Sequence, residues 1–107
     1  MTHVSTHVLD AVTGRPATGV AVTLSDAEGT VLADARTDGD GRVADLHTGE
    51  LSGLYRLRFN TAAYFAGLQM PSFYPEIVIA FEIDNATTKY HVPVLLSPYA
   101  YSTYRGS

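Results

Sequence analysis

The chain has 107 residues and a formal net charge of −4, and its length predicts a single domain over residues 1–107. Lys89 is the only lysine and no basic run is present, so nucleic acid and anionic membranes are poor partners. The absence of cysteine excludes disulfides, zinc–thiolate sites and thiol chemistry.

The first residues, "MTHVSTHVLDAV", lack the basic start and the apolar run of a signal peptide. No stretch of the chain approaches the roughly 20 apolar residues that cross a bilayer. We therefore expect a soluble, cytoplasmic protein.

The N-terminal half has the texture of short strands separated by turn residues. Residues 6–13 alternate between two faces, and "GRPATG" predicts a turn at residues 14–19. Further strands are predicted at residues 20–26, 30–38 and 42–46. In the first of these, the core-facing side chains are Val20, Val22 and Leu24.

The C-terminal half continues the pattern around a single helix. "LYRLRFN", residues 54–60, alternates cleanly and turns Tyr55, Leu57 and Phe59 toward the core. "TAAYFAGL" is the only segment with helical content, and it ends at Gly67. The strand predicted at residues 76–83 has one face made of Ile77, Ile79, Phe81 and Ile83.

The last segment follows a turn predicted at residues 84–89 and contains one or two strands over residues 90–104. Tyr90, Val92 and Val94 form its core face. Pro93 and Pro98 indicate breaks or sheet edges, because proline cannot donate to a ladder. Seven to eight short strands with regular turns and one helix predict an all-β sandwich of two sheets.

The four histidines are the first chemical candidates. His3 and His7 share a strand face, where a rise of about 3.3 Å per residue separates them by about 13 Å, too far to share a metal. His47 is interpreted as a solvated loop histidine. His91 lies between the core-facing residues Tyr90 and Val92 and therefore points outward. From the residues alone, His7 and His91 are interpreted as half-exposed histidines on the outer face of a sheet.

"DGDGR" invites a calcium interpretation, but neither register places oxygen ligands and glycine as an EF-hand loop requires. A glycine-rich hairpin turn at residues 38–41 is preferred. Arg42 follows this turn, either as a surface arginine or as a guanidinium at the mouth of a site. The chain then ends on the unusual "YRGS".

Three segments stand out together: "STHVLDAVTGRPATGVAVTL" near the start, "TDGDGR" in the middle and "YHVPVLLSPYAYSTYRGS" at the end. They resemble the 5-hydroxyisourate hydrolase family, the transthyretin-related enzymes of urate breakdown, over essentially the whole chain. The combination of "YRGS", "HVP" and "THVLD" is the specific part. "GRPATGVAVTL" alone is weak evidence for this family, because many prealbumin-like and adhesin-type sandwiches contain similar sequences.

The resemblance implies a transthyretin-like sandwich of two antiparallel sheets and a homotetramer whose active sites lie in a channel between dimers. A small core would gain from such an assembly. The implied reaction is the hydrolysis of a cyclic amide bond in 5-hydroxyisourate, which gives 2-oxo-4-hydroxy-4-carboxy-5-ureidoimidazoline. The resemblance implies no metal and no cofactor.

The resemblance carries the catalytic site to His7 in "THVLD", Arg42 in "DGR" and His91 in "HVP". Arg42 would hold a carbonyl oxygen as negative charge builds on it, and the histidines would be base and orienter in either order. The expected substrate-binding tail consists of Tyr104, Arg105, Gly106 and Ser107. In this interpretation Tyr104 stacks on the substrate or hydrogen-bonds to it, and Arg105 anchors the tail. Gly106 permits a backbone bend, and Ser107 with its terminal carboxylate completes a polar wall.

Two other functions fit a β-sandwich, because fold does not settle function. A transthyretin-type small-molecule carrier would need an apolar channel without these histidines and the arginine. An adhesin-type sandwich locked by an isopeptide bond would need a lysine in an early strand, whereas Lys89 comes late.

Overall fold

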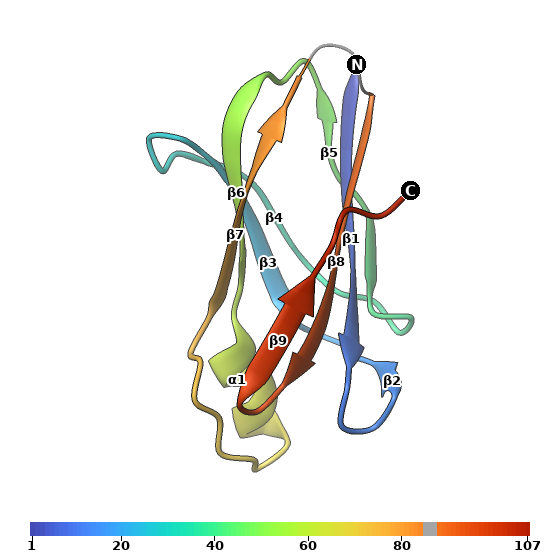
Figure 1. The fold of residues 1–107 in the computed structure, drawn as a ribbon, viewed down its shortest axis with the longest axis vertical. Helices are drawn as coiled ribbons and strands as arrows, with labels where there is room; N and C mark the ends of the chain where they lie inside the picture. Colours follow the sequence, from blue (N-terminus) through green and yellow to red (C-terminus); the bar gives the residue numbers. More distant parts are fainter. Residues whose placement is uncertain (85–87) are drawn as a thin grey trace.

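The computed structural model describes residues 1–84 and 88–107, and nine strands and one helix within them form a sandwich of two sheets (Figure 1). Sheet A contains β1 (Thr2–Asp10), β2 (Arg15–Pro16), β5 (Arg42–Gly49), β8 (Lys89–Ser97) and β9 (Ala100–Thr103). Sheet B contains β3 (Ala21–Asp26), β4 (Val31–Arg36), β6 (Gly53–Phe59) and β7 (Ile77–Ile83). Helix α1 is Thr61–Gly67, and residues 85–87 of the predicted turn lie outside the described residues.

Alternate apolar side chains of the strands fill the space between the sheets, as the sequence predicts. Val4 and Val8 of β1 and Leu57 and Phe59 of β6 are completely buried. The predicted core faces of residues 20–26, 54–60 and 90–94 are confirmed, because their members are all buried. In β7 only the end residues Ile77 and Ile83 are buried, because this strand lies at the edge of sheet B.

The centre of sheet A is a parallel pair formed by β1 and β8 (Figure 1). The antiparallel arrangement expected from the resemblance holds for the other strand pairs described, but these two strands run in the same direction. They come from opposite ends of the chain, so no hairpin dictates their direction. The buried Thr6 hydroxyl donates to the Val92 carbonyl at 2.6 Å and joins them further.

Several local predictions need correction. The turn predicted at residues 14–19 contains β2, which pairs with Leu9 and Asp10 and raises the strand count above eight. Pro93 lies inside β8 rather than at a break or an edge, and the β8–β9 ladder begins beside it at Val94. Pro98 lies in the turn between these strands, as predicted.

His47 is a strand residue and not a solvated loop histidine. Strand β5 continues past Leu46 to pair with the start of β1, and His47 is half-buried opposite Val4. His3 has a different partner, because its Nε2 atom lies 3.3 Å from Asp45 Oδ1.

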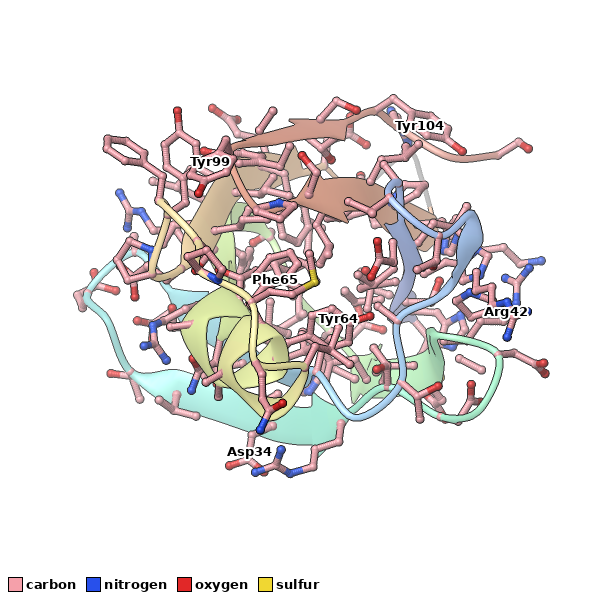
Figure 2. The ribbon with its side chains drawn as sticks, turned by 90° about the horizontal axis from the view of Figure 1, so that it is seen from below. Asp34, Arg42, Tyr64, Phe65, Tyr99 and Tyr104 are labelled. Carbon is pink, nitrogen blue, oxygen red and sulfur yellow. The ribbon has the colours of Figure 1, made fainter. Side chains whose placement is uncertain are left out.

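Helix α1 occurs where it was predicted and seals one end of the sandwich (Figure 2). The Asn60 side chain caps it by accepting the N–H of Ala63, and Phe65 is buried between the layers. The Tyr64 hydroxyl donates to Asp10 Oδ2 at 2.8 Å, while the other oxygen of this buried carboxylate accepts the N–H of Val12. Burial and the adjacent carboxylate raise the pKa of Tyr64 to about 12.

The contact between Tyr64 and Asp10 predicts a stability change. Tyr64→Phe should lower the free energy of unfolding by about 1–2 kcal/mol, because a buried acceptor loses its donor. The exposed Tyr99, replaced by phenylalanine, is the matched control and should change stability by less than about 0.5 kcal/mol. Urea denaturation followed by circular dichroism measures both, and equal stability of wild type and Tyr64→Phe would contradict the prediction.

The same contact predicts a dependence on pH. The pKa of Tyr64 is raised from 10.0 to about 12, so its contribution is complete below pH 10 and declines as the pH rises toward 12. The stability gap between wild type and Tyr64→Phe should therefore be constant from neutral pH up to about pH 10 and narrow above it. A gap that widens with alkaline pH would contradict the assignment.

Candidate functional site

His91 lies on the outer face of sheet A, with the buried residues Tyr90 and Val92 on either side of it in β8. This orientation was predicted from the alternation. Its ring is half-buried, and Nδ1 lies 2.8 Å from the Oγ atom of Ser5, its register partner in β1. Burial lowers the pKa of His91, and the nearby Arg42 and His7 lower it further. The ring is therefore neutral near neutral pH, as a general base requires.

The turn at residues 38–41 places Arg42 beside this histidine. The Asp38 carboxylate accepts the backbone N–H groups of Arg42 and Asp40, and these two bonds are the main reason that the pKa of Asp38 is lowered. Gly41 adopts a φ of 75°, and an added Cβ would collide with the Val8 carbonyl. The turn thus needs its aspartate and its glycine, and it starts β5 with an exposed Arg42.

His7 is the register partner of Arg42 across the β1–β5 ladder. Its Nε2 atom lies 2.9 Å from the backbone carbonyl oxygen of Asp40. A carbonyl only accepts hydrogen bonds, so Nε2 of His7 carries the proton in this contact. The turn that presents Arg42 therefore also orients the second histidine.

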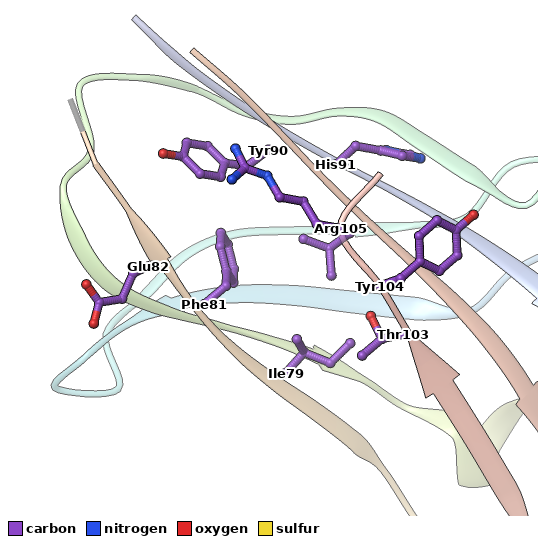
Figure 3. A pocket seen from close by; sticks show the side chains of 9 residues that line it. Ile79, Phe81, Glu82, Tyr90, His91, Thr103, Tyr104 and Arg105 are labelled. Atoms are coloured by element: carbon purple, nitrogen blue, oxygen red, sulfur yellow. The ribbon is translucent and has the colours of Figure 1, made fainter. Parts of the chain in front are cut away.

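The C-terminal tail contacts β8 through a backbone hydrogen bond and a cation–π contact. The Gly106 N–H donates to the His91 carbonyl at 2.9 Å, and the Arg105 guanidinium lies 5.1 Å above the Tyr90 ring (Figure 3). An added Cβ on Gly106 would collide with the ring of His91. Close approach, and not the backbone bend that was expected, explains this glycine, because its φ is not positive.

Two cavities flank the tail. A polar cavity of about 290 Å³ is lined by groups that include Ser5, Arg42, Lys89, His91 and Ser107. A mainly apolar cavity of about 370 Å³ lies on the other side, against Ile79, Phe81, Tyr90, Tyr104 and Arg105 (Figure 3).

The structure therefore brings Arg42, His91 and Ser107 of the expected site around the polar cavity. His7 joins them through its pairing with Arg42, whereas Tyr104 and Arg105 line the apolar cavity. Sequence reasoning missed Ser5, although the alternation of β1 places it on the same face as His7. It also missed Lys89 at the rim, which no motif marks.

Across residues 1–84 and 88–107, no three histidine or carboxylate side chains gather where they would hold a metal ion. The only helix in these ranges has seven residues, which is too short to cross a membrane.

Comparisons with known proteins point to one family. The HIUase/Transthyretin family model matches residues 4–106. A 5-hydroxyisourate hydrolase from Caulobacter vibrioides is 46% identical, with 100% of both chains covered. The structure of Klebsiella pneumoniae 5-hydroxyisourate hydrolase superposes with a TM-score of 0.91 at 41% identity, over 99% of this chain and 100% of that chain.

A transthyretin from Sparus aurata also matches, with a TM-score of 0.91 at 31% identity over 99% of this chain and 97% of that chain. The likeness in fold thus extends to a relative whose name does not describe a hydrolase. By the match of the family model and the identity to these relatives, the chain belongs to the HIUase/Transthyretin family.

Proposed function

We propose that the chain hydrolyses 5-hydroxyisourate in urate degradation, by opening a cyclic amide bond. The observation that carries this proposal is the meeting of His91, Arg42 and Ser107 around one polar cavity, with His7 beside Arg42. The named hydrolases among the relatives support the choice of substrate. The substrate offers ring carbonyls and N–H groups that these polar side chains can bind.

The geometry supports a division of roles. Nε2 of His91 takes a proton from a water molecule as this water attacks the ring carbonyl carbon. The Arg42 guanidinium stabilises the negative charge that develops on the carbonyl oxygen. The C–N amide bond then breaks, and the proton held by His91 passes to the departing nitrogen. His7, held by the Asp40 carbonyl, orients the substrate beside Arg42.

The polar lining favours this hydrolysis over a transthyretin-type small-molecule carrier. A carrier would need an apolar surface at the place where Arg42, Lys89 and His91 line the polar cavity. In the tail, Ser107 completes the polar wall, Arg105 anchors the segment on Tyr90, and Tyr104 reaches the substrate from the neighbouring apolar cavity that it lines.

We further propose that the single-domain chain works as a homotetramer that closes the outer face of sheet A. The polar cavity lies on this face and is open in one subunit. Light scattering at micromolar concentration would show the tetramer mass, and a fully active monomer would contradict this part of the proposal.

The proposed hydrolase activity predicts that the protein accelerates the decay of its substrate. Urate oxidase generates 5-hydroxyisourate, whose ultraviolet absorbance should decay faster with this protein than without it. His91→Asn and Arg42→Gln should each lower kcat by about 10²-fold or more, because each removes a group that acts in the transition state. Arg36→Gln, on sheet B, is the control and should retain normal turnover. The absence of acceleration by wild type would refute the hydrolase proposal.

The pKa shift of His91 predicts a pH profile. A base must be neutral, and burial, Arg42 and His7 lower the pKa of His91 below 6.5, so kcat/KM should rise with pH to a plateau with a midpoint below 6.5. Arg42→Gln removes a positive neighbour and should move this midpoint to higher pH, whereas Arg36→Gln should not. A midpoint that falls in Arg42→Gln would exclude His91 as the base.

The tail predicts a separation of activity from stability. Deletion of residues 104–107 should lower kcat/KM by at least about 10²-fold with little change in Tm, because the tail contributes to the site more than to the core. Gly106→Ala should lower kcat/KM by about 10-fold or more, since a Cβ there displaces the ring of His91. Gly67→Ala is the matched control, because a Cβ at Gly67 meets nothing within 4 Å. Normal activity of the truncated chain would show that the tail is dispensable.

A further inference from the structure

We propose that Ser5 is a positioning residue that holds His91 in the tautomer with the Nδ1 proton, so that the Nε2 lone pair faces the polar cavity. The catalytic meaning of this arrangement rests on the proposed hydrolase function. The tautomer itself is a property of the free protein and can be measured without substrate.

The backbone fixes the distance between the two side chains. Ser5 and His91 are direct partners in the parallel β1–β8 ladder, and their side chains leave sheet A on the same outer face. Next to this pair, Thr6 turns inward and its buried hydroxyl donates to the Val92 carbonyl at 2.6 Å. The Gly106 N–H holds the His91 carbonyl from the other side. The register cannot slip without breaking these contacts.

The hydrogen bond between the side chains leaves one ring nitrogen available. Ser5 Oγ lies 2.8 Å from Nδ1 of His91, and within the described residues no other hydrogen-bond partner contacts this ring. The other nitrogen, Nε2, is therefore the one available for the reaction, and the His91 side chain lines the polar cavity together with Ser5 as well as the apolar cavity. A serine hydroxyl can donate or accept, so this geometry permits either tautomer.

The reaction distinguishes these tautomers. A ring that takes a proton from water at Nε2 must carry its own proton on Nδ1, and that N–H then donates to Ser5 Oγ. The Ser5 hydroxyl proton remains free to bind an acceptor in the cavity. Fixing the tautomer through the second ring nitrogen is a common way in which proteins prepare a histidine.

Burial is the main cause of the lowered pKa of His91, and Arg42 and His7 lower it further, so the ring is neutral and the tautomer is the property to be set. His3 and His7 of β1, Arg42 of β5 and Lys89 of β8 surround the cavity or act on His91. The terminal carboxylate of Ser107 is the one anionic group in the described lining. This mostly positive surrounding disfavours the imidazolium form.

Nitrogen NMR of protein with ¹⁵N-labelled histidine tests the tautomer directly. At about pH 8 the ring is neutral, and wild-type His91 should show a protonated Nδ1 and an unprotonated Nε2. The Ser5→Ala variant should shift His91 toward the tautomer with the Nε2 proton, because the acceptor for the Nδ1 proton is gone. A wild-type His91 that carries its proton on Nε2 would overturn the proposal.

Kinetics of three variants test the consequence. Ser5→Ala should lower kcat by about 10-fold to 100-fold while KM stays within about 3-fold, since ring orientation acts on the transition state. Ser5→Thr keeps a hydroxyl at the same position and should restore kcat to within about 3-fold of wild type. Ser25→Ala, on sheet B, is the matched control and should leave kcat unchanged. Wild-type kcat in Ser5→Ala would overturn the positioning role.

The two measurements separate this proposal from the proposed function. If wild type fails to hydrolyse 5-hydroxyisourate while NMR shows the Nδ1 proton and its loss in Ser5→Ala, the function is wrong and the tautomer assignment stands. If wild type is active and Ser5→Ala is equally active, the function stands and the role of Ser5 is wrong.

Discussion

The parallel pairing of β1 and β8 is the constraint on which the site depends. It joins the two ends of the chain in register, so that Ser5 meets His91 across the ladder. On its other side β1 pairs with β5, which sets His7 opposite Arg42. A slip of one residue would turn every side chain of a strand to the other face, and the packed valines of β1 resist such a slip. The hydrophobic core therefore fixes the relative positions of the polar groups outside it.

The alternation of β8 explains how the tail becomes part of this arrangement. Tyr90 turns inward, where it is 5% exposed and its hydroxyl accepts the backbone N–H of Asp84. The ring held in this way is the platform for the Arg105 guanidinium. One residue later, His91 turns outward and its carbonyl accepts the Gly106 N–H. Adjacent residues thus hold the tail through a side chain and through the backbone.

The sequence predicted what local alternation determines, namely the core faces, the helix and the outward direction of His91. It did not predict what depends on pairing between distant segments. The parallel direction of β1 and β8, the place of Pro93 inside β8 and the inclusion of His47 in β5 all follow from the neighbouring strands. The contact between Ser5 and His91 belongs to this class, because residues 86 positions apart carry no common local pattern.

The roles suggested by the family resemblance depend on geometry in the same way. Arg42, His91 and Ser107 line one cavity, but Tyr104 and Arg105 face the apolar one, which the motif "YRGS" does not reveal. The glycine of this motif illustrates the reason. Its φ is ordinary, and the need for glycine arises only because the ring of His91 lies against it. A motif names the residue types, whereas the strand pairing decides which of them meet.

The position of the site on the outer face of a sheet has a consequence for catalysis. The core between the sheets is complete without the polar groups, so changes at Ser5, Arg42 or Gly106 act on the reaction more than on folding. An exposed sheet face, however, cannot exclude water by itself, and charges that face water interact weakly. The electrostatic effect of Arg42 on a developing oxyanion therefore grows if another subunit covers this face, as the proposed tetramer would do. In this arrangement assembly contributes to the chemistry as well as to stability.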